Sequence, residues 1–559
     1  MNFCSKVWDE CKNISILNTP FSLQARDGVF LNSAKKRTDI WHSEVAFCSE
    51  FGGASYDESI CFGGGPVVLN STQDLSSPSG ICLEKIGNGS YLNMVAHPDG
   101  SNRVFISNQL GKIWLATVPE EGSGEVLAID ESSPFLDLTD KVYFDAEFGM
   151  SGLAFHPNYQ DNGRFFVSFN CDKFKWPAEC SGRCSCNSEV GCKPENLVPE
   201  NGAHPCQYHS VIAEFTANDT TSQPSLVTVT SAKPQEVRRI FTMGLPFTSQ
   251  HGGQILFGPE DGYLYFMMGY GGSRGDPYNF SQNKKCLLEK IMRLDVDNMP
   301  SAAEIAALGL WGNYSIPGDN PFLELKEFRP EIWALGLQNP WRCSFDSERP
   351  SHFLCADIGQ DQYEESHPNS SVESMSASTI NMILPVMRYN HSDIKKAEGS
   401  ASIIGGFFYR SSTDPCMFGR YLYADLLSGD MWAGTENPRG SGTFTSYNLP
   451  VSCACNSPIP CSDTVGDSLP ALGFTFSFGE DNRKDIFILS SSGLYRVVRP
   501  SRCNFSCSKE NVTAYTYPQS AASPPPRFTS NGWQLSILIN ELLFFFPSLL
   551  FSALLILSN

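Results

Sequence analysis

The chain has 559 residues, of which 41% are hydrophobic and 18% charged, so it is long enough for one large domain with smaller segments beside it. Its 60 acidic and 40 basic residues give a net charge of −20, which repels phosphate backbones and argues against a nucleic-acid partner. The 46 glycines and 39 phenylalanines favour many short strands and turns over long helices.

The body of the chain indicates an oxidising, secretory compartment. It has 20 cysteines, and its N-glycosylation sequons predict glycans at Asn13, Asn70, Asn88, Asn218, Asn279, Asn313, Asn369, Asn390, Asn504 and Asn511. The alternative is a reduced cytosolic protein with incidental cysteines. The first residues lack the basic and apolar segments of a signal peptide, so we expect a shortened start and infer secretion from the body alone.

Residues 1–82 are predicted to form a short cysteine-rich segment. Four cysteines with few strand patterns around them lie in it, at Cys4, Cys11, Cys48 and Cys61. Four cysteines allow three pairings, and the sequence does not choose among them. We expect Cys82 to link this segment to the domain that follows.

Residues 83–500 repeat one unit, an apolar run, a turn with proline or acidic residues, and a second apolar run. The clearest copy places Gln254–Phe257 and Tyr263–Met268 around an Asp-Gly turn, which is hairpin chemistry. Other copies predict strands at Arg103–Ile106, Arg164–Phe169, Phe353–Ala356 and Asp485–Leu489, and single strands are expected at Lys112–Ala116, Val211–Phe215, Phe407–Arg410 and Arg420–Asp425. Repetition of this kind predicts an all-β chain and favours a β-propeller.

Two cysteine clusters interrupt this pattern. The first comprises Cys171, Cys180, Cys184, Cys186, Cys192 and Cys206, and the second Cys453, Cys455 and Cys461. Such spacing is compatible with zinc, but in a secreted chain a disulfide-stapled loop is the favoured interpretation.

The C-terminal part is predicted to anchor the protein. A Ser/Pro-rich linker, 501–533, precedes an apolar tail, 534–559, that has no basic flank. Small residues, a polar spacer and a short apolar end predict a GPI-attachment signal with Ser530 as the attachment residue and Asn531 as its competitor. A tail-anchored helix is the alternative. The predicted location is the extracellular face of the plasma membrane.

Several motifs occur in a characteristic order. They are FGMSGLAFHP at 148–157, the hairpin stretch at 249–272, RPEIWALGLQNPWRCSFD at 329–346, LCADIGQDQYEE at 354–365 and SFGEDNRKDIFILSSSGLYRV at 477–497. Together they resemble the soluble quinoprotein glucose/sorbosone dehydrogenase family, and within it the hedgehog-interacting-protein-like proteins. The resemblance covers roughly residues 82–500 and implies a six-bladed β-propeller that holds pyrroloquinoline quinone (PQQ) beside calcium on its axis.

The resemblance also implies roles for individual residues. His251 matches the base that takes the sugar hydroxyl proton, and an imidazole titrates in a suitable range. The other roles are substrate contact for Glu147, PQQ contact for Asn339, clamping of PQQ carboxylates for Arg410 and Arg420, and calcium binding through the backbone carbonyls of Gly359 and Gln360. Each has a structural alternative: a hydrogen-bonded histidine, a loop carboxylate, a turn before proline, or ion pairs at a sheet edge.

Three departures from the family pattern weaken the enzymatic interpretation. The glycine-rich loop 269–272 reads Gly-Tyr-Gly-Gly where the family has Gly-Asp-Gly-Gly, which removes the acid that holds the histidine unless Asp276 substitutes. Gln338 stands where active enzymes place an arginine, and it supplies no fixed positive charge. After Glu365 the family's Gly-Gly-Asn-Tyr-Gly-Trp segment is replaced by SHPNSSVESMSAS.

The sequence thus leaves two functions open. The first is a PQQ- and calcium-dependent oxidoreductase that acts on the CH–OH group of a sugar or alcohol at the cell surface. The alternative is a non-catalytic extracellular propeller that binds a protein or glycan ligand, which the three departures favour.

Overall fold

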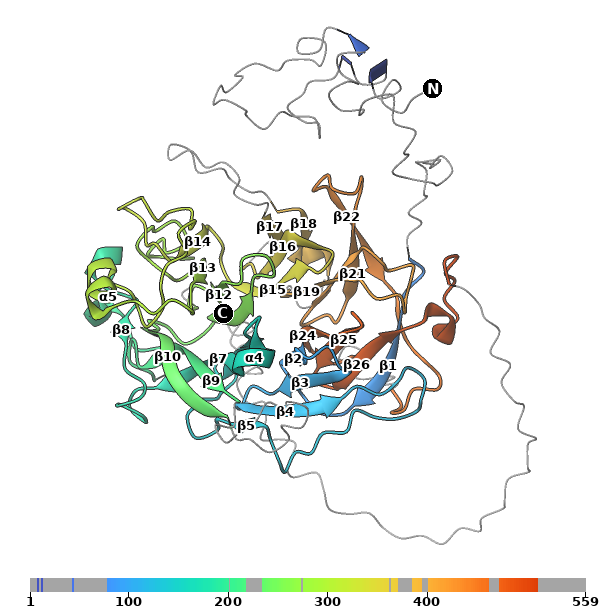
Figure 1. Cartoon of the computed structure of the whole chain (residues 1–559), viewed down its shortest axis with the longest axis horizontal. Coiled ribbons are helices and arrows are strands. Elements are labelled where there is room, and N and C mark those ends of the chain that lie inside the picture. Colours follow the sequence, from blue (N-terminus) through green and yellow to red (C-terminus); the bar gives the residue numbers. More distant parts are fainter. Residues whose placement is uncertain are drawn as a thin grey trace, which may run out of the picture. The chain divides into compact units, whose positions relative to one another are not determined.

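The computed structural model describes residues 8–9, 12–13, 43–44, 78–200, 202–217, 234–272, 275–360, 363–369, 385–394, 401–461 and 472–510 (Figure 1). The chain divides into two compact units, residues 1–76 and 77–559. The four cysteines predicted for the N-terminal segment lie outside the described residues, as do Ser530 and the apolar tail. Within the described ranges, no helix is long and apolar enough to cross a membrane.

The second unit is built almost wholly of antiparallel sheets, which confirms the all-β prediction. Three of them have four strands each. The first contains β11 (Gly252–Phe257), β12 (Leu264–Met268), β13 (Lys290–Leu294) and β14 (Ile332–Leu335). The second contains β15 (Pro340–Asp346), β16 (Arg349–Asp357), β17 (Tyr363–Asn369) and β18 (Met387–Asn390). The third contains β19 (Ile403–Phe408), β20 (Tyr421–Asp425), β21 (Met431–Glu436) and β22 (Phe444–Leu449).

The remaining strands form two larger sheets. A five-stranded sheet holds β6 (Met150–Phe155), β7 (Arg164–Asp172), β9 (Tyr208–Thr216), β10 (Gln235–Gly244) and the edge strand β8 (Arg183–Cys184). A nine-stranded sheet has the order β23-β1-β26-β25-β24-β2-β3-β4-β5. Its strands are β1 (Ile81–Gly87), β2 (Asn93–Ala96), β3 (Arg103–Ser107), β4 (Lys112–Thr117), β5 (Leu136–Asp137), β23 (Val451–Cys453), β24 (Thr475–Glu480), β25 (Ile486–Ser490) and β26 (Gly493–Val498).

Helices are short. They are α4 (Tyr159–Asn162), α5 (Ala302–Leu308) and the 3-10 turns Ser188–Val190, Pro194–Asn196, His391–Asp393 and Pro500–Cys503. Helix α5 starts where Ser301 and Glu304 form a reciprocal capping box.

Six strands form a ring around a common centre. Four are the first strands of the smaller sheets, β6, β11, β15 and β19, and two, β2 and β24, are adjacent strands of the nine-stranded sheet. These ring strands contact one another in the order β2, β6, β11, β15, β19 and β24. The ring closes where β24 pairs with β2 in a single parallel bridge, Val95 to Glu480. Strand β1 then pairs antiparallel with β26, which places the first strand of this sheet-built region beside its last strand (Figure 1). A closed ring of antiparallel sheets is a propeller-like architecture.

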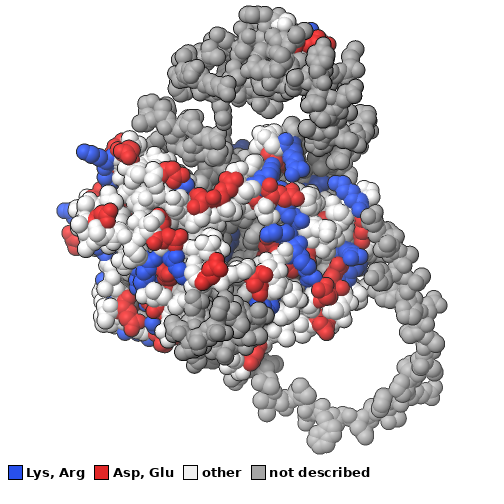
Figure 2. Space-filling view, in the orientation of Figure 1, with Lys and Arg blue, Asp and Glu red and all other residues white. Residues whose placement is uncertain are grey.

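Apolar side chains between neighbouring sheets hold the ring together. Phe155 stacks on Phe105 at 4.4 Å and on Phe165 at 5.5 Å, joining the sheets of β3 and β7. Strands β12 and β25 are buried on both faces, so they read as continuous apolar runs. Burying each such phenylalanine contributes about 1.5–3 kcal/mol. Acidic side chains recur across the visible face in Figure 2.

The cysteines confirm the stapled-loop prediction and correct one other expectation. The loop is closed by Cys171–Cys180, Cys184–Cys206 and Cys186–Cys192, and further bonds join Cys343–Cys355, Cys416–Cys507 and Cys453–Cys461. Cys82 does not link the N-terminal segment to the domain. It bonds to Cys503 because β1 lies against β26, directly before the turn that carries Cys503. Cys286 and Cys455 are unpaired.

The predicted glycosylation sites differ in their surroundings. Asn88, Asn279 and Asn504 are exposed. Asn313 is half-buried, and its amide nitrogen, the atom that would carry a glycan, donates to the Arg239 carbonyl at 3.0 Å. A glycan at Asn313 would replace one of the two N–H groups of this nitrogen and compete with the hydrogen bond, whereas the exposed sites, which include Asn13, lie open to solvent.

The closing disulfide should contribute measurably to stability. Cys82 and Cys503 are 421 residues apart, and cross-linking so long a loop restricts the unfolded chain strongly. We expect Cys82→Ala with Cys503→Ala to lower the free energy of unfolding by about 2–5 kcal/mol. Chemical denaturation measures this, with Cys453→Ala plus Cys461→Ala as the control, because that bond closes a separation of only 8 residues. An equal loss from the two pairs would contradict the long-loop argument.

Candidate functional site

His251 lies at the start of ring strand β11, where glycines allow close packing. Gly252 and Gly253 have φ values of 64° and 105°, a region that disfavours other residues. A Cβ on Gly253 would lie 2.6 Å from the Cβ of Ser151 on the neighbouring ring strand β6. The His-Gly-Gly sequence therefore brings two ring strands together beneath the imidazole.

The imidazole of His251 is enclosed but unpaired. The residue is 6% exposed, and its ring stacks on the buried Phe148 at 4.9 Å with 12° between the planes. Neither ring nitrogen makes a hydrogen bond to any residue that the structure describes. Burial lowers the pKa of His251 to about 3, because desolvation disfavours the imidazolium. The ring is consequently neutral at physiological pH.

The glycine-rich loop covers the histidine from the other side. The amide of Gly269 donates to the His251 carbonyl at 3.1 Å, and that of Gly271 donates to the Gln250 carbonyl at 3.0 Å. A Cβ on Gly271 would lie 3.6 Å from Cε1 of His251. Tyr270, which replaces the family's acid, is buried in this loop. The loop thus takes its shape from backbone hydrogen bonds without that acid.

Asp276 does not take the place of the missing acid. Its carboxylate accepts hydrogen bonds from the backbone amides of Phe280 at 2.7 Å and Ser281 at 3.2 Å. Because the nitrogens of His251 have no partner within the described chain, Asp276 makes no hydrogen bond to the imidazole. Within the described ranges, no carboxylate therefore fixes the tautomer of His251.

Asn339 lies beside the histidine, as the resemblance implies. Its amide nitrogen donates to the Gln250 side chain at 2.5 Å, and a Cβ on Gly269 would lie only 2.1 Å from its oxygen Oδ1. That oxygen is buried and, within the described residues, accepts no hydrogen bond. The site therefore presents a second polar atom in need of a partner.

Asp357 ties the segment of Asn339 to the predicted calcium loop. Its carboxylate accepts from the backbone amides of Gln338 at 2.9 Å and Asn339 at 2.6 Å. Burial raises the pKa of Asp357 to about 6, in spite of these hydrogen bonds. Gln338 uses its backbone here and brings no charge to the site.

The two predicted calcium ligands lie next to the glycine-rich loop. The Gln360 side chain accepts from the Gly275 amide at 2.9 Å, and the Gly359 amide donates to Glu364 at 3.2 Å. A Cβ on Gly359 would lie 1.9 Å from the Tyr363 carbonyl, so only glycine fits this turn. The predicted base, cofactor contact and calcium loop are thereby brought to one end of the ring.

With this geometry established, similarity to known proteins identifies the family. The profile described as Glucose / Sorbosone dehydrogenase matches residues 91–362. The HIPL1 protein of Arabidopsis thaliana is 59% identical over 569 residues, covering 96% of this chain and 81% of that protein. The chain belongs to the hedgehog-interacting-protein-like (HIPL) proteins of the soluble quinoprotein glucose/sorbosone dehydrogenase family.

Two more distant proteins are also similar to this chain. The human Hedgehog-interacting protein is 26% identical and aligns with 81% of the HIPL chain, which spans 57% of that protein. The PQQ-bound aldose sugar dehydrogenase structure of Streptomyces coelicolor is 14% identical, covers 76% of this chain and 99% of its own, and has a TM-score of 0.44.

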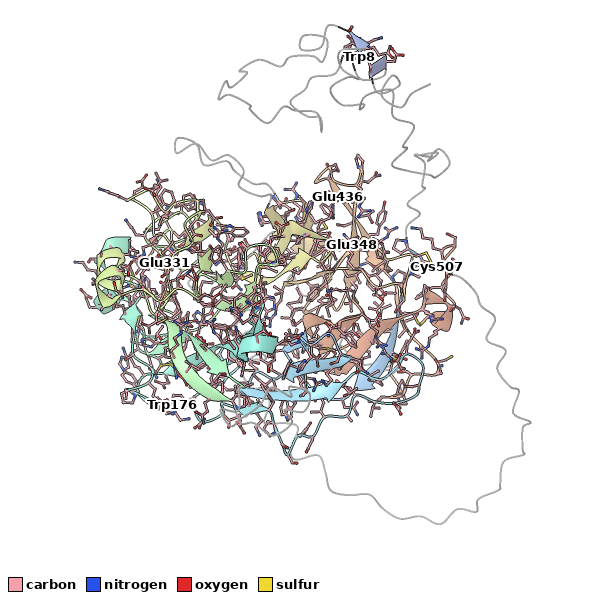
Figure 3. All side chains as sticks on the ribbon, in the orientation of Figure 1. Trp8, Trp176, Glu331, Glu348, Glu436 and Cys507 are labelled. Carbon is pink, nitrogen blue, oxygen red and sulfur yellow. A yellow bond between two sulfur atoms is a disulfide. The ribbon has the colours of Figure 1, made fainter. Side chains whose placement is uncertain are left out.

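Arg410 and Arg420 are engaged elsewhere in the HIPL chain. Arg410, just after β19, pairs with Asp346 and, at 2.9 Å, with Glu348, which Figure 3 labels. Arg420 donates to the Cys416 carbonyl at 3.1 Å. A cofactor-binding role for either arginine would require these interactions to be given up.

Glu147 lies near the histidine segment. It is an exposed residue, and its carboxylate accepts from the Gln250 amide at 3.4 Å. Desolvation of the carboxylate raises its pKa, and the nearby Asp145 and Glu200 act in the same direction. Its role as a substrate contact stays a prediction.

Sequence reasoning missed the buried pair Glu289 and Lys290. The Glu289 amide donates to the Gly269 carbonyl at 3.3 Å, and burial raises the pKa of its side chain to about 9. The Lys290 ammonium donates to three carbonyls, of Phe280, Ser281 and Leu288. The sequence does carry a signal for this pair, because Glu-Lys interrupts the apolar run 286–294. In the structure the pair supports the glycine-rich loop.

His251 should make stability depend on pH. Its folded pKa, about 3, lies below the ordinary 6.5, so the unfolded chain binds this proton first as pH falls. Stability is lost between these values, by about 1 kcal/mol per pH unit. We expect His251→Gln to remove this contribution, so that urea denaturation at pH 7 and pH 5 shows a smaller loss than in the wild type. The exposed His204→Gln is the control, and parallel profiles for wild type and His251→Gln would contradict the assignment.

Proposed function

We propose that this HIPL chain is a PQQ-dependent oxidoreductase that acts on the CH–OH group of a sugar or alcohol, on a propeller of six blades. One observation carries the proposal. A neutral, buried imidazole lies beside Oδ1 of Asn339 at one end of the ring, and among the described residues neither its two nitrogens nor that oxygen has a hydrogen-bond partner. Buried polar atoms are almost always paired in folded proteins, so this group of atoms fits a polar ligand.

The chain's own residues supply positioning and proton transfer. The neutral His251 accepts the proton of the substrate hydroxyl, while stacking on Phe148 holds the ring plane. Hydrogen bonds to Asp357 and Gln250 fix Asn339, which orients the cofactor. When bound, PQQ supplies the hydride acceptor and calcium the Lewis acid, with the carbonyls of Gly359 and Gln360 proposed to hold the ion.

A ligand also has to compensate for the low basicity of the histidine. A base with a pKa of about 3 takes a proton poorly at neutral pH. Negative charge placed beside the ring raises the pKa of an imidazole, because it stabilises the imidazolium. We propose that the carboxylates of the bound cofactor play this part, since Asp276 is engaged with backbone amides.

Titration of PQQ into the calcium-loaded, full-length protein tests the proposal. We expect saturable one-to-one binding by calorimetry, dependent on calcium, and at least about tenfold weaker in Asn339→Ala, which loses a buried polar contact of roughly 1–3 kcal/mol. His251→Ala should weaken binding as well. His204→Ala, on the exposed loop, is the matched control. Folded protein that binds no PQQ would contradict the proposal.

The second candidate is a non-catalytic propeller that binds a protein or glycan ligand. Gln338 contributes only its backbone amide to Asp357, and the loop position of the family's acid is a buried tyrosine. The Hedgehog-interacting protein is named for a protein ligand and is 26% identical to this chain. Absence of PQQ binding would favour this candidate, and the search would turn to extracellular proteins and glycans.

We also propose that the protein acts outside the cell, anchored through a lipid at Ser530. Seven disulfides among the described residues fit an oxidising compartment. Release from intact cells by phosphatidylinositol-specific phospholipase C tests the anchor, and retention after treatment would favour a tail-anchored helix.

A further inference from the structure

Arg342 is a buried cation in the middle of the molecule. It follows Trp341 on ring strand β15 and is 5% exposed. The enzymatic proposal does not use it. Its surroundings raise the question of what balances its charge.

The side chain of Arg342 crosses the space that the ring strands enclose. Its Nη1 donates to the Ser151 carbonyl on β6 at 3.0 Å and to the Asn93 side chain on β2 at 3.3 Å, and its Nη2 donates to the Leu92 carbonyl at 3.3 Å. Strand β15 is separated from β2 by β19 and β24, and from β6 by β11. A side chain that reaches both strands must therefore lie in the central channel.

No carboxylate balances this guanidinium among the residues that the structure describes. Its three protein partners are neutral oxygens, and the Trp341 ring, 5.0 Å away, offers only a weak cation–π contact. Other buried arginines have acids, for example Arg329 with Glu331 and Arg496 with Glu84. Burying an uncompensated ion costs several kcal/mol.

One nitrogen of the Arg342 guanidinium also lacks any partner. Its Nε is buried and makes no hydrogen bond within the described part of the chain. Desolvation lowers the pKa of Arg342 to about 9, so the group is still charged at neutral pH. The guanidinium is enclosed, since the residue is only 5% exposed and its other nitrogens bond to Leu92, Asn93 and Ser151. A partner must be small and negatively charged, and must accept a hydrogen bond.

We propose that the central channel binds a small monovalent anion, a halide or a small carboxylate, at Nε of Arg342. The anion neutralises the guanidinium and accepts a hydrogen bond from its unpartnered Nε. This site is independent of PQQ and of the function proposed above, because it requires only the ring strands and Arg342.

Crystals of the full-length protein grown in sodium bromide test the site directly. We expect an anomalous bromide peak within hydrogen-bond distance of Nε of Arg342. A parallel crystal in sodium formate distinguishes the two sources, since planar density would identify a carboxylate. Only water at this nitrogen in both crystals would overturn the proposal.

Thermal unfolding gives a solution test with matched variants. Bromide should raise the Tm of the wild type in a saturable way, compared with sodium gluconate at equal ionic strength, because a ligand of the folded state stabilises it. Arg342→Met should lose this halide-specific rise. Arg329→Met removes another buried arginine whose charge Glu331 balances, so it should lower Tm yet retain the rise. Identical responses to bromide and gluconate in the wild type would contradict the proposal. This comparison uses the wild type alone, so it remains valid even if Arg342→Met fails to fold.

Discussion

The pairing of β1 with β26 is the interaction on which the rest of this structure depends. It completes the last sheet with the first strand, from Cys82 opposite Val498 onward, and the Cys82–Cys503 bond locks the pair. Only a closed ring brings β2 to β24, and only then do the ring strands enclose a centre. Arg342 lies on ring strand β15 and His251 directly precedes ring strand β11, so the candidate sites exist because the ring is closed.

Inside this ring, desolvation determines the protonation state of His251. The imidazole of His251 is kept neutral by an apolar wall that includes Phe148, whereas an enzyme of the family pattern would hold it with an acid. Its nitrogens and Oδ1 of Asn339 are left without protein partners in the described chain. A polar ligand gains most where such atoms are already buried and fixed, because their reorganisation costs little. Arg342 is a second buried polar group of this kind, since its Nε has no hydrogen-bond partner among the described residues.

The sequence predicted those features that are local. Alternating apolar runs with Asp-Gly or proline turns placed strands near Arg103 and Arg164, and the structure has β3 and β7 there. The order of the family motifs predicted that His251 and Asn339 belong to one site. Long-range partners were beyond reach: the expected strand at Phe407–Arg410 ends earlier, and Arg410 pairs with an acid 64 residues away. Cys82 was misassigned for the same reason, since its partner lies at the other end of the domain.

We propose that substrate is dehydrogenated at the His251 end of the ring. Single-turnover reduction of bound PQQ tests this proposal. Protein loaded with calcium and PQQ is mixed with a panel of aldoses without oxygen, and the quinone absorbance is followed. The account predicts that one sugar class reduces the cofactor in the wild type, and that His251→Gln slows this step by about 10²–10⁴-fold, the usual effect of losing a general base. Bound PQQ that no sugar reduces, or equal rates in wild type and His251→Gln, would contradict it.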